Sequence, residues 1–323
     1  MLTIKRTFLA TIILLVSQIA YGQWLGELLE KSMIHDDVER TYVVYIPSSL
    51  DEDPNGYPLL IGLHGTSSNG VGMMATAHLF NESERGKFIV ACPDGLNYGL
   101  TTYFNAGEHY EELTDDDGDG VGTDDLGFIS RIIDQMIQEY PVDPNRVYAM
   151  GHSNGGIMAY RLAAQCPDKI AAIASNSGPM VYTEDPCGPV PIIHTHGLED
   201  PLIPYEGTVL NGVTVPPVET VMEEWRLVNG CDANSIEIYD ETVPIYDDEG
   251  VYLYDNNIVG VQWADPNGAN DIVLYTYSKG GHEWRSSADG LAATPVFWDF
   301  LKQHRLTSAE AVVSEPNTLT LQQ

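Results

Sequence analysis

The stretch Gly151-His152-Ser153-Asn154-Gly155 constrains this chain more than any other, because few backbones can accommodate it. An apolar run at residues 146–150 predicts a short strand before it, and residues 154–165 predict a helix after it. Glycine at both ends of the G-x-S-x-G pattern permits a turn too sharp for any side chain there. Such a turn would raise the Ser153 hydroxyl above a sheet edge. It would also aim the first N–H groups of the helix at whatever the serine attacks.

Apolar, β-branched stretches alternate with helical patterns along the rest of the chain. Strands are expected at residues 40–46, 59–65, 88–95, 169–174, 191–197 and 272–277. Helices are expected up to about residue 80 and at residues 126–140, 218–228 and 291–305. A Tyr-rich, alternating stretch at residues 239–263 predicts a hairpin or an insertion. The alternation predicts an α/β fold, a mostly parallel central sheet covered by helices on both faces.

The N-terminal residues have the pattern of a secretory signal peptide. Lys5 and Arg6 precede an apolar run at residues 8–16, and small residues stand at positions 20 and 22. The run is shorter than the roughly 20 residues that a membrane span needs. We therefore predict a signal peptide at residues 1–22, a catalytic domain at 23–306 and a loose tail at 307–323. The mature protein is expected to be secreted, extracellular or periplasmic, without a membrane span.

The net charge limits the partners of this protein. Its 323 residues include 47 Asp and Glu against 15 Lys and Arg, which gives a formal charge of −32. Such a surface repels nucleic acid and anionic membranes. A neutral substrate is the partner that this charge favours.

Four cysteines allow three pairings, and export permits disulfides. Cys92 ends a predicted core strand and Cys166 lies in a predicted helix, so both are expected to be buried free thiols. Cys187 and Cys231 lie in predicted loops and form the better candidate pair.

A serine hydroxyl becomes a nucleophile only when a base accepts its proton, and the base needs an acid to orient it. In a fold with this elbow, the chain order is serine, acid, histidine. Glu199 and Asp200 follow a predicted strand, and either could be the acid. We prefer Asp200, because a shorter side chain at a tight turn loses less conformational entropy.

Two histidines follow the predicted acid. His304 lies in a charged helical end and is expected to be a solvated surface residue. His282 lies in a Gly-rich loop after the last predicted strand, where an imidazole would be presented to the serine. We therefore predict His282 as the base.

Acyl transfer also requires N–H donors for the oxyanion. Asn154, directly after the nucleophile, and Thr66, in the loop after an early strand, are the predicted donors. His64 is expected to be structural. His152 is expected to be a packing residue or to line the substrate pocket, and Trp284 is expected to line that pocket.

Seven motifs, in this order along the chain, resemble those of the secreted esterase family that contains polyhydroxybutyrate depolymerases and feruloyl esterases. They occupy residues 63–65, 93–95, 104–107, 124–128, 151–156, 196–205 and 280–284. The resemblance implies an α/β-hydrolase with a Ser153, Asp200 and His282 triad, and it supports the Cys187–Cys231 disulfide. Phe104 stands where the family has Trp, and residues 239–263 match poorly, so both are expected to bear on the substrate pocket.

These features together predict a secreted serine carboxylesterase. Its ester substrate is expected to be a polyester or an esterified polysaccharide, cleaved through an acyl-enzyme on Ser153. The alternatives are a serine peptidase on the same fold and a non-catalytic secreted binding protein. The chemistry itself requires no cofactor.

The acidic stretch at residues 115–125 resembles the first half of an EF-hand calcium loop. Asp115, Asp117 and Asp119 alternate before Gly120, and Asp125 or Asp124 would replace the missing bidentate Glu. Crowded carboxylates repel one another unless a cation offsets the repulsion, which favours a structural calcium ion. A solvated acidic loop is the alternative, with Asp124 and Asp125 capping the following helix.

Overall fold

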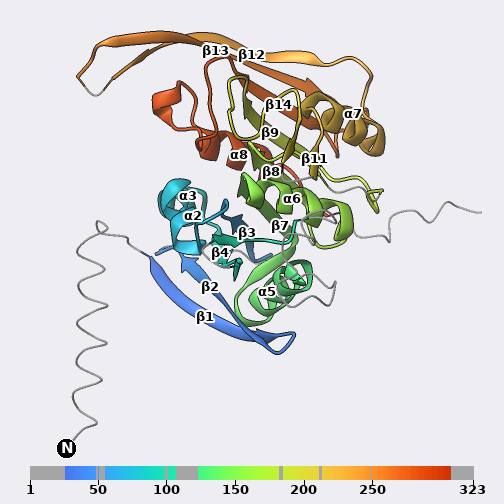
Figure 1. Ribbon diagram of the computed structural model, residues 1–323. Helices are drawn as coiled ribbons and strands as arrows, with labels where there is room; N and C mark the ends of the chain where they lie inside the picture. Colours follow the sequence, from blue (N-terminus) through green and yellow to red (C-terminus); the bar gives the residue numbers. More distant parts are fainter. Residues whose placement is uncertain are drawn as a thin grey trace, which may run out of the picture.

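A ten-stranded sheet forms the centre of the protein in a computed structural model (Figure 1). The structure describes residues 26–48, 50, 55–98, 101–106, 123–181, 185–210, 213–247 and 249–306. Across the sheet the strands are β1 (Glu27–His35), β2 (Val38–Ile46), β4 (Ile89–Pro93), β3 (Tyr57–Leu63), β7 (Val142–His152), β8 (Ala172–Asn176), β9 (Ile192–Gly197), β14 (Ile272–Tyr277), β13 (Tyr252–Trp263) and β12 (Ile236–Tyr246). The strands from β4 to β14 run parallel, and an antiparallel pair flanks them at each edge.

Helices cover both faces of the sheet, as the alternating pattern predicts. The helices α5 (Asp125–Glu139), α6 (Asn154–Gln165) and α7 (Val218–Asn229) pack on one face, against side chains such as Leu59 and Ile61. The helices α2 (Gly70–Thr76), α3 (Leu79–Gly86) and α8 (Ala293–Leu301) pack on the other face, against Leu60 and Met150. Successive residues of a strand thus enter opposite cores, which explains why these strands are apolar throughout.

Some elements differ from the sequence prediction. One helix was expected up to residue 80, but the left-handed residue His78 (φ 51°) separates α2 from α3. The edge strand β1 was not predicted, because nearly all of its residues are exposed or only partly buried and charged residues interrupt its apolar ones. Short strand pairs were also missed, namely β5 (Leu96–Tyr98) with β6 (Thr101–Tyr103) and β10 (Thr208–Leu210) with β11 (Val213–Val215).

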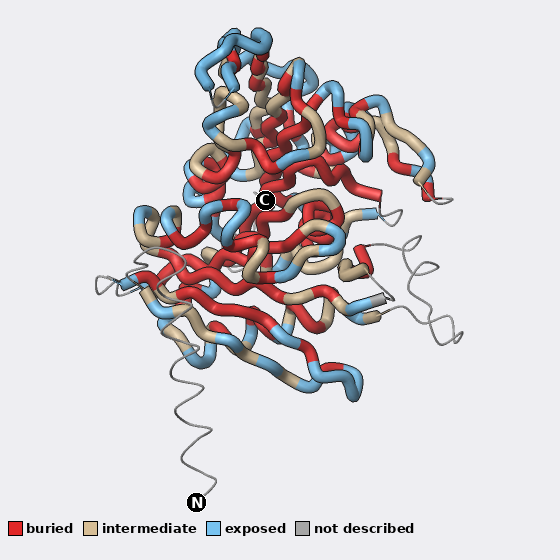
Figure 2. Tube along the Cα trace, turned by 60° about the vertical axis from the view of Figure 1, so that its left-hand side comes forward, coloured by how far each residue is buried: buried red, intermediate tan, exposed pale blue. Residues whose placement is uncertain are grey.

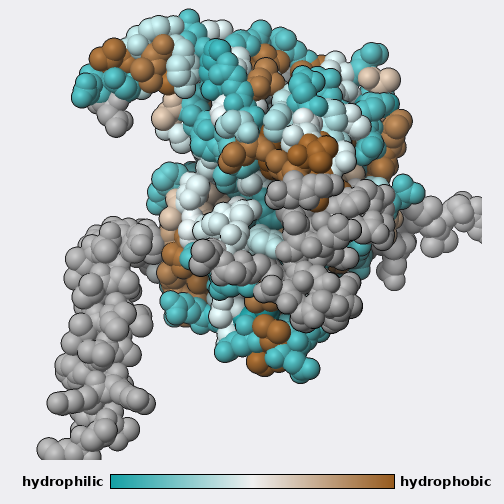
Figure 3. Space-filling model, viewed as in Figure 1, coloured by the Kyte–Doolittle hydropathy of each residue, from teal (hydrophilic) through white to brown (hydrophobic). Residues whose placement is uncertain are grey.

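The predicted Tyr-rich hairpin is confirmed as β12 and β13, which pair antiparallel at the edge of the sheet. The hairpin projects beyond the helices (Figure 1), and much of its length is exposed (Figure 2). Hydrophobic side chains gather toward its free end (Figure 3), where Val251, Tyr252 and Leu253 are each more than half exposed. Just before β13 begins to pair with β14, Asn256 is buried and contacts the loop that follows β14.

The predicted Cys187–Cys231 disulfide is absent, since all four cysteines are free thiols. Cys231 is buried, and its thiol donates to the Asn270 carbonyl at 3.3 Å. Cys187 lies at the end of α6 instead, where its N–H donates to the Ala164 carbonyl at 2.8 Å. Cys92 is buried as expected, and burial raises the pKa of its thiol.

Several sequence predictions fall outside the described residues. They are the signal peptide at 1–22, the tail at 307–323, and the candidate calcium ligands Asp115, Asp117 and Asp119. Within the described part of the chain, no helix has the length and apolar character needed to cross a membrane.

Candidate active site

The elbow joins β7 to α6 at the centre of the sheet. Ser153 has φ 54° and ψ −122°, a conformation that costs free energy and holds its side chain at the tip of the turn. A Cβ at Gly151 would lie 2.1 Å from the Gly155 carbonyl oxygen, and one at Gly155 would lie 2.2 Å from the Leu63 carbonyl oxygen. Both glycines are therefore required by close backbone contacts, as the sequence predicts.

The structure brings together the three predicted catalytic side chains, which come from the ends of three strands. His282 Nε2 lies 2.8 Å from Ser153 Oγ, and His282 Nδ1 lies 2.8 Å from Asp200 Oδ2. Ser153 follows β7, Asp200 follows β9 and His282 follows β14. This hydrogen-bonded chain is the arrangement that lets a histidine accept a serine proton while a carboxylate orients its ring.

Backbone donors hold the acid in place. Asp200 is buried, and its Oδ1 accepts hydrogen bonds from the N–H groups of Leu202 and Ile203, both at 2.9 Å. Burial alone would raise the pKa of Asp200, but the hydrogen bonds from His282 and these N–H groups outweigh it and lower the pKa below its usual value. The alternative acid, Glu199, instead forms an exposed ion pair with Lys279.

Behind the acid lies a chain of buried polar side chains that the sequence reasoning missed. The Tyr160 hydroxyl contacts His194 Nδ1 at 3.0 Å, and His194 Nε2 contacts His196 Nδ1 at 3.1 Å. His196 Nε2 then donates to the Ile203 carbonyl at 2.8 Å, because that oxygen can only accept. The signal in the sequence was histidine at alternate positions of a buried strand.

The loop that carries His282 is held by its carbonyl groups. The Gly280 carbonyl accepts from the Glu199 N–H at 3.1 Å. The His282 carbonyl accepts from His152 Nε2 at 2.7 Å, and the Glu283 carbonyl accepts from an Asn176 side chain at 3.1 Å. Burial lowers the pKa of His152 to about 4, so its ring is neutral at pH 7. His152 therefore positions the base-bearing loop in addition to lining the pocket.

Two N–H groups are available beside the nucleophile. Asn154 is the first residue of α6. Thr66 follows Gly65, where an added Cβ would lie 3.3 Å from Ser153 Cβ. Among the described residues, neither the Thr66 nor the Asn154 N–H donates to another group. Both N–H groups thus belong to segments beside the nucleophile, and their role as donors to the oxyanion of a bound ester stays a prediction.

His64 lies in the core behind these donors, as expected of a structural residue. Its Nε2 accepts from the Gly95 N–H at 2.9 Å, and its Nδ1 donates to the Gly65 carbonyl at 2.8 Å. Burial lowers the pKa of His64 and keeps it neutral. The Gly65 carbonyl and the Thr66 N–H belong to one peptide plane, so His64 also fixes the direction of that N–H.

Phe104 does not line the pocket, contrary to expectation. It is fully buried, and its ring centroid lies 4.6 Å from that of His64. Its N–H and carbonyl bond the Asn154 side chain at 2.7 and 2.9 Å, which joins this segment to the elbow.

A cavity of about 430 Å³ opens above Ser153. Trp284 lies in its wall as predicted, with its indole N–H bonded to Thr294 at 3.1 Å and its ring edge-on to His152. Leu202 forms an exposed part of the rim. The lining residues are His64, Gly65, Thr66, Ser68, Met73, Thr76, His152, Ser153, Leu202, His282, Glu283 and Trp284.

Asp125 is not placed as a calcium ligand. It is fully buried at the start of α5, forms an ion pair with Arg40, and accepts from the Asn105 N–H at 2.6 Å. Its carboxylate is therefore already occupied by a cation. Asp124 caps α5 through the Gly127 N–H at 2.7 Å, which was the alternative considered for it.

His304 is not the solvated residue that its sequence context indicated. It is buried, and its Nδ1 donates to the Ala269 carbonyl at 3.2 Å. It takes no part in the contacts among Ser153, Asp200 and His282.

Comparison with known proteins gives the family context of this site. The phospholipase/carboxylesterase family matches residues 51–211. A bifunctional acetylxylan esterase/xylanase of Neocallimastix patriciarum is 37% identical over 164 residues, which are 50% of this chain and 22% of that protein. Feruloyl esterase B of Piromyces equi is 27% identical over 278 residues, 83% of this chain and 46% of that protein. The chain thus spans less than half the length of both relatives.

Solved structures share the fold. An acetyl xylan esterase from Aspergillus awamori superposes with a TM-score of 0.56 at 18% identity, over 85% of this chain and 100% of that one. A feruloyl esterase module from Clostridium thermocellum gives a TM-score of 0.52 at 14% identity, over 86% and 92% of the two chains. The predicted α/β-hydrolase fold is therefore confirmed, and so is the resemblance at the level of the esterases.

Proposed function

Because the phospholipase/carboxylesterase family matches residues 51–211 of this chain, we propose that it is a secreted serine carboxylesterase that acts on esterified polysaccharide. The observation that carries the proposal is the hydrogen-bonded chain from Ser153 through His282 to Asp200, with 2.8 Å at both steps. A serine, a histidine and a buried carboxylate in this order perform acyl transfer.

In the first half of the reaction, Ser153 Oγ attacks the ester carbonyl carbon while its proton passes to His282 Nε2. The carbonyl oxygen becomes an oxyanion, which the N–H groups of Thr66 and Asn154 stabilise. When the carbon–oxygen bond to the alcohol breaks, His282 returns the proton to the leaving oxygen. The acyl group is then bound to Ser153 as an ester.

In the second half, water attacks the acyl-enzyme and gives its proton to His282. The second tetrahedral species releases the carboxylic acid, and Ser153 regains its proton. Asp200 keeps its charge throughout and stabilises the imidazolium that forms twice in each cycle. The low pKa of Asp200 supports this role, because a protonated acid could not do so.

Two observations support a polysaccharide ester as the substrate. The relatives named above are an acetylxylan esterase/xylanase and a feruloyl esterase. The net charge of −32 disfavours anionic substrates and tolerates neutral sugar chains. A polyester such as polyhydroxybutyrate is the competing substrate, and polymer films included in the substrate panel test it.

The first experiment measures hydrolysis of p-nitrophenyl acetate, followed by methyl ferulate, acetylated xylan, polyhydroxybutyrate film and a peptide. We expect turnover of the small ester, and the Ser153→Ala substitution should lower kcat by roughly 10⁴-fold or more. Peptide turnover faster than ester turnover would contradict the assignment. N-terminal sequencing of exported protein tests secretion, since a leader of residues 1–22 would leave Gln23 first.

A further inference from the structure

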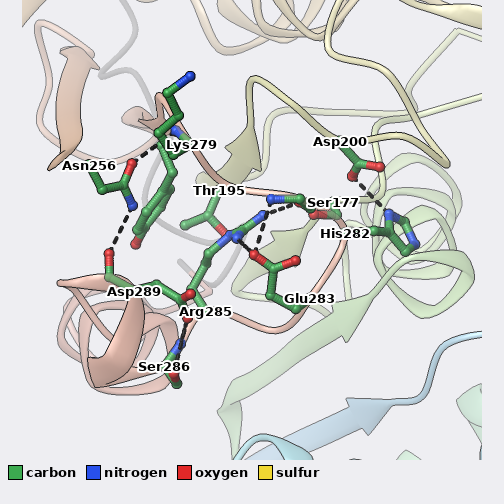
Figure 4. Close-up of polar contacts among 12 residues, drawn as sticks. Ser177, Thr195, Asp200, Asn256, Lys279, His282, Glu283, Arg285, Ser286 and Asp289 are labelled. Carbon is green, nitrogen blue, oxygen red and sulfur yellow. Dashed lines mark hydrogen bonds and ion pairs between the residues drawn. The ribbon is translucent and has the colours of Figure 1, made fainter. Parts of the chain in front are cut away.

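The structure assigns Arg285 as a positioning residue for His282, and this inference rests on the proposed function. Arg285 is 1% exposed and lies just beyond the loop that carries the base (Figure 4). One of its terminal nitrogens donates to the Gly281 carbonyl and the other to the Glu283 carboxylate. The guanidinium thus holds the residues directly before and after His282.

With Arg285, each backbone carbonyl from residue 280 to residue 283 has a hydrogen-bond donor. The carbonyl groups of residues 280, 282 and 283 bond Glu199, His152 and Asn176, and only the carbonyl of Gly281 remains for Arg285. The Gly281 N–H in turn donates to the Glu283 carboxylate at 3.0 Å. This fork of two donors on one planar group fixes direction as well as distance, which a single donor cannot do.

The backbone at two neighbouring glycines lies too close to the guanidinium to leave room for a side chain. A Cβ at Gly197 would lie 2.6 Å from Arg285 Nη2, and one at Gly280 would lie 2.8 Å from Arg285 Cζ. Both glycines flank the triad loops, since Gly197 ends β9 before Asp200 and Gly280 precedes His282. The Tyr277 ring lies 5.1 Å from the guanidinium carbon and closes the site on another side.

Stability alone does not account for this arginine. Its Nε is buried without a hydrogen-bond partner among the described residues, and its carboxylate partner Glu283 is half exposed. Burying a cation in such a setting costs free energy that an apolar side chain of similar size would avoid. By fixing His282 within reach of Ser153, Arg285 raises the catalytic rate, and this gain offsets its cost in folding free energy.

The test compares Arg285→Met with the wild-type chain. Loss of the fork should let the loop relax, and a base misplaced by about 1 Å lowers turnover by up to roughly 100-fold. We expect kcat for p-nitrophenyl acetate to fall about 10- to 100-fold, with KM within about twofold. The melting temperature should stay the same or rise, because an apolar side chain replaces a poorly paired buried cation.

A second readout does not depend on the ester. The rate at which a fluorophosphonate labels Ser153 reports its activation by His282, and it should fall by the same factor as kcat. Wild-type protein that labels but hydrolyses no ester would contradict the proposed function alone. Labelling at the wild-type rate in Arg285→Met would overturn the role of Arg285 alone.

Two further variants keep the outcome interpretable. Arg285→Lys retains the charge and one donor, so its kcat should lie between those of Arg285→Met and the wild type, and full wild-type kcat would overturn the need for the fork. Lys279→Met is the matched control, because it removes an exposed cation of the same loop. An equal loss of kcat in Lys279→Met would overturn the proposal. A lowered melting temperature of Arg285→Met beside its loss of kcat would do the same, because it would identify a general structural role.

Discussion

The buried His196 makes the stability of this protein depend on pH. Its side chain is fully buried between His194 and the Ile203 carbonyl, and its Nε2 lies 3.6 Å from Asp200. Burial is the largest cause that lowers the pKa of His196 to about 4, against a partial rise from its contacts with Ile203 and Asp200. The unfolded chain has the ordinary histidine pKa, about 6.5.

The sign of the effect follows from these two values. Between pH 6.5 and 4 the unfolded state binds a proton at this position and the folded state does not, so the free energy of unfolding decreases as the pH falls. The full contribution is present above pH 6.5. With one pKa unit worth about 1.4 kcal/mol, His196 alone should lower the free energy of unfolding by about 2.5 kcal/mol between pH 7.5 and 4.5.

The measurement is urea unfolding of wild type and His196→Gln at pH 7.5, 6.5, 5.5 and 4.5, followed by tryptophan fluorescence. Glutamine keeps an N–H donor for the Ile203 carbonyl but does not titrate in this range. The carboxylates and the other histidines titrate in both proteins, so the difference between the two curves isolates His196. The variant should lose about 2.5 kcal/mol less than the wild type over this range. Parallel curves would refute the reasoning.

Three other predictions concern single carboxylates and the acidic loop. Asp200→Asn should lower kcat by about 10⁴-fold, because an amide cannot stabilise the imidazolium or hold the same tautomer, and a loss below tenfold in the ester assay would contradict the assigned acid. Asp124→Ala should lower the free energy of unfolding by about 1 kcal/mol through loss of the α5 cap, which urea unfolding measures. Calcium binding by Asp115, Asp117 and Asp119 stays a prediction: millimolar calcium should raise the melting temperature, and an unchanged melting curve with calcium or chelator would contradict it.

Local sequence patterns predicted the elements around the nucleophile closely. The helix expected at residues 154–165 has the same bounds as α6, because its apolar spacing and the glycines before it act over a few residues. The motif order also selected Asp200 and His282 as the residues that meet Ser153. Chain order is a topological rule, and it needs no side-chain detail.

Contacts between distant residues escaped the sequence reasoning. Asn176 and Glu283 are 107 residues apart, yet their hydrogen bond helps to hold the base-bearing loop. Arg285 and Asp125 are charged yet fully buried, and local sequence does not reveal this, because burial of a charge depends on partners that only the fold supplies. His304 was misjudged for a related reason, since a charged helical end predicts exposure and the packing against Phe300 overrides it.

The catalytic triad can form only after the strands β7, β9 and β14, which carry its residues, have assembled during folding. Ser153 and His282 are 129 residues apart, and β14 must pair with β9 before His282 can approach the serine. A partly assembled sheet that lacks β14 contains a complete elbow and acid but an unactivated serine. During refolding, fluorophosphonate labelling of Ser153 therefore times the joining of β14 to β9.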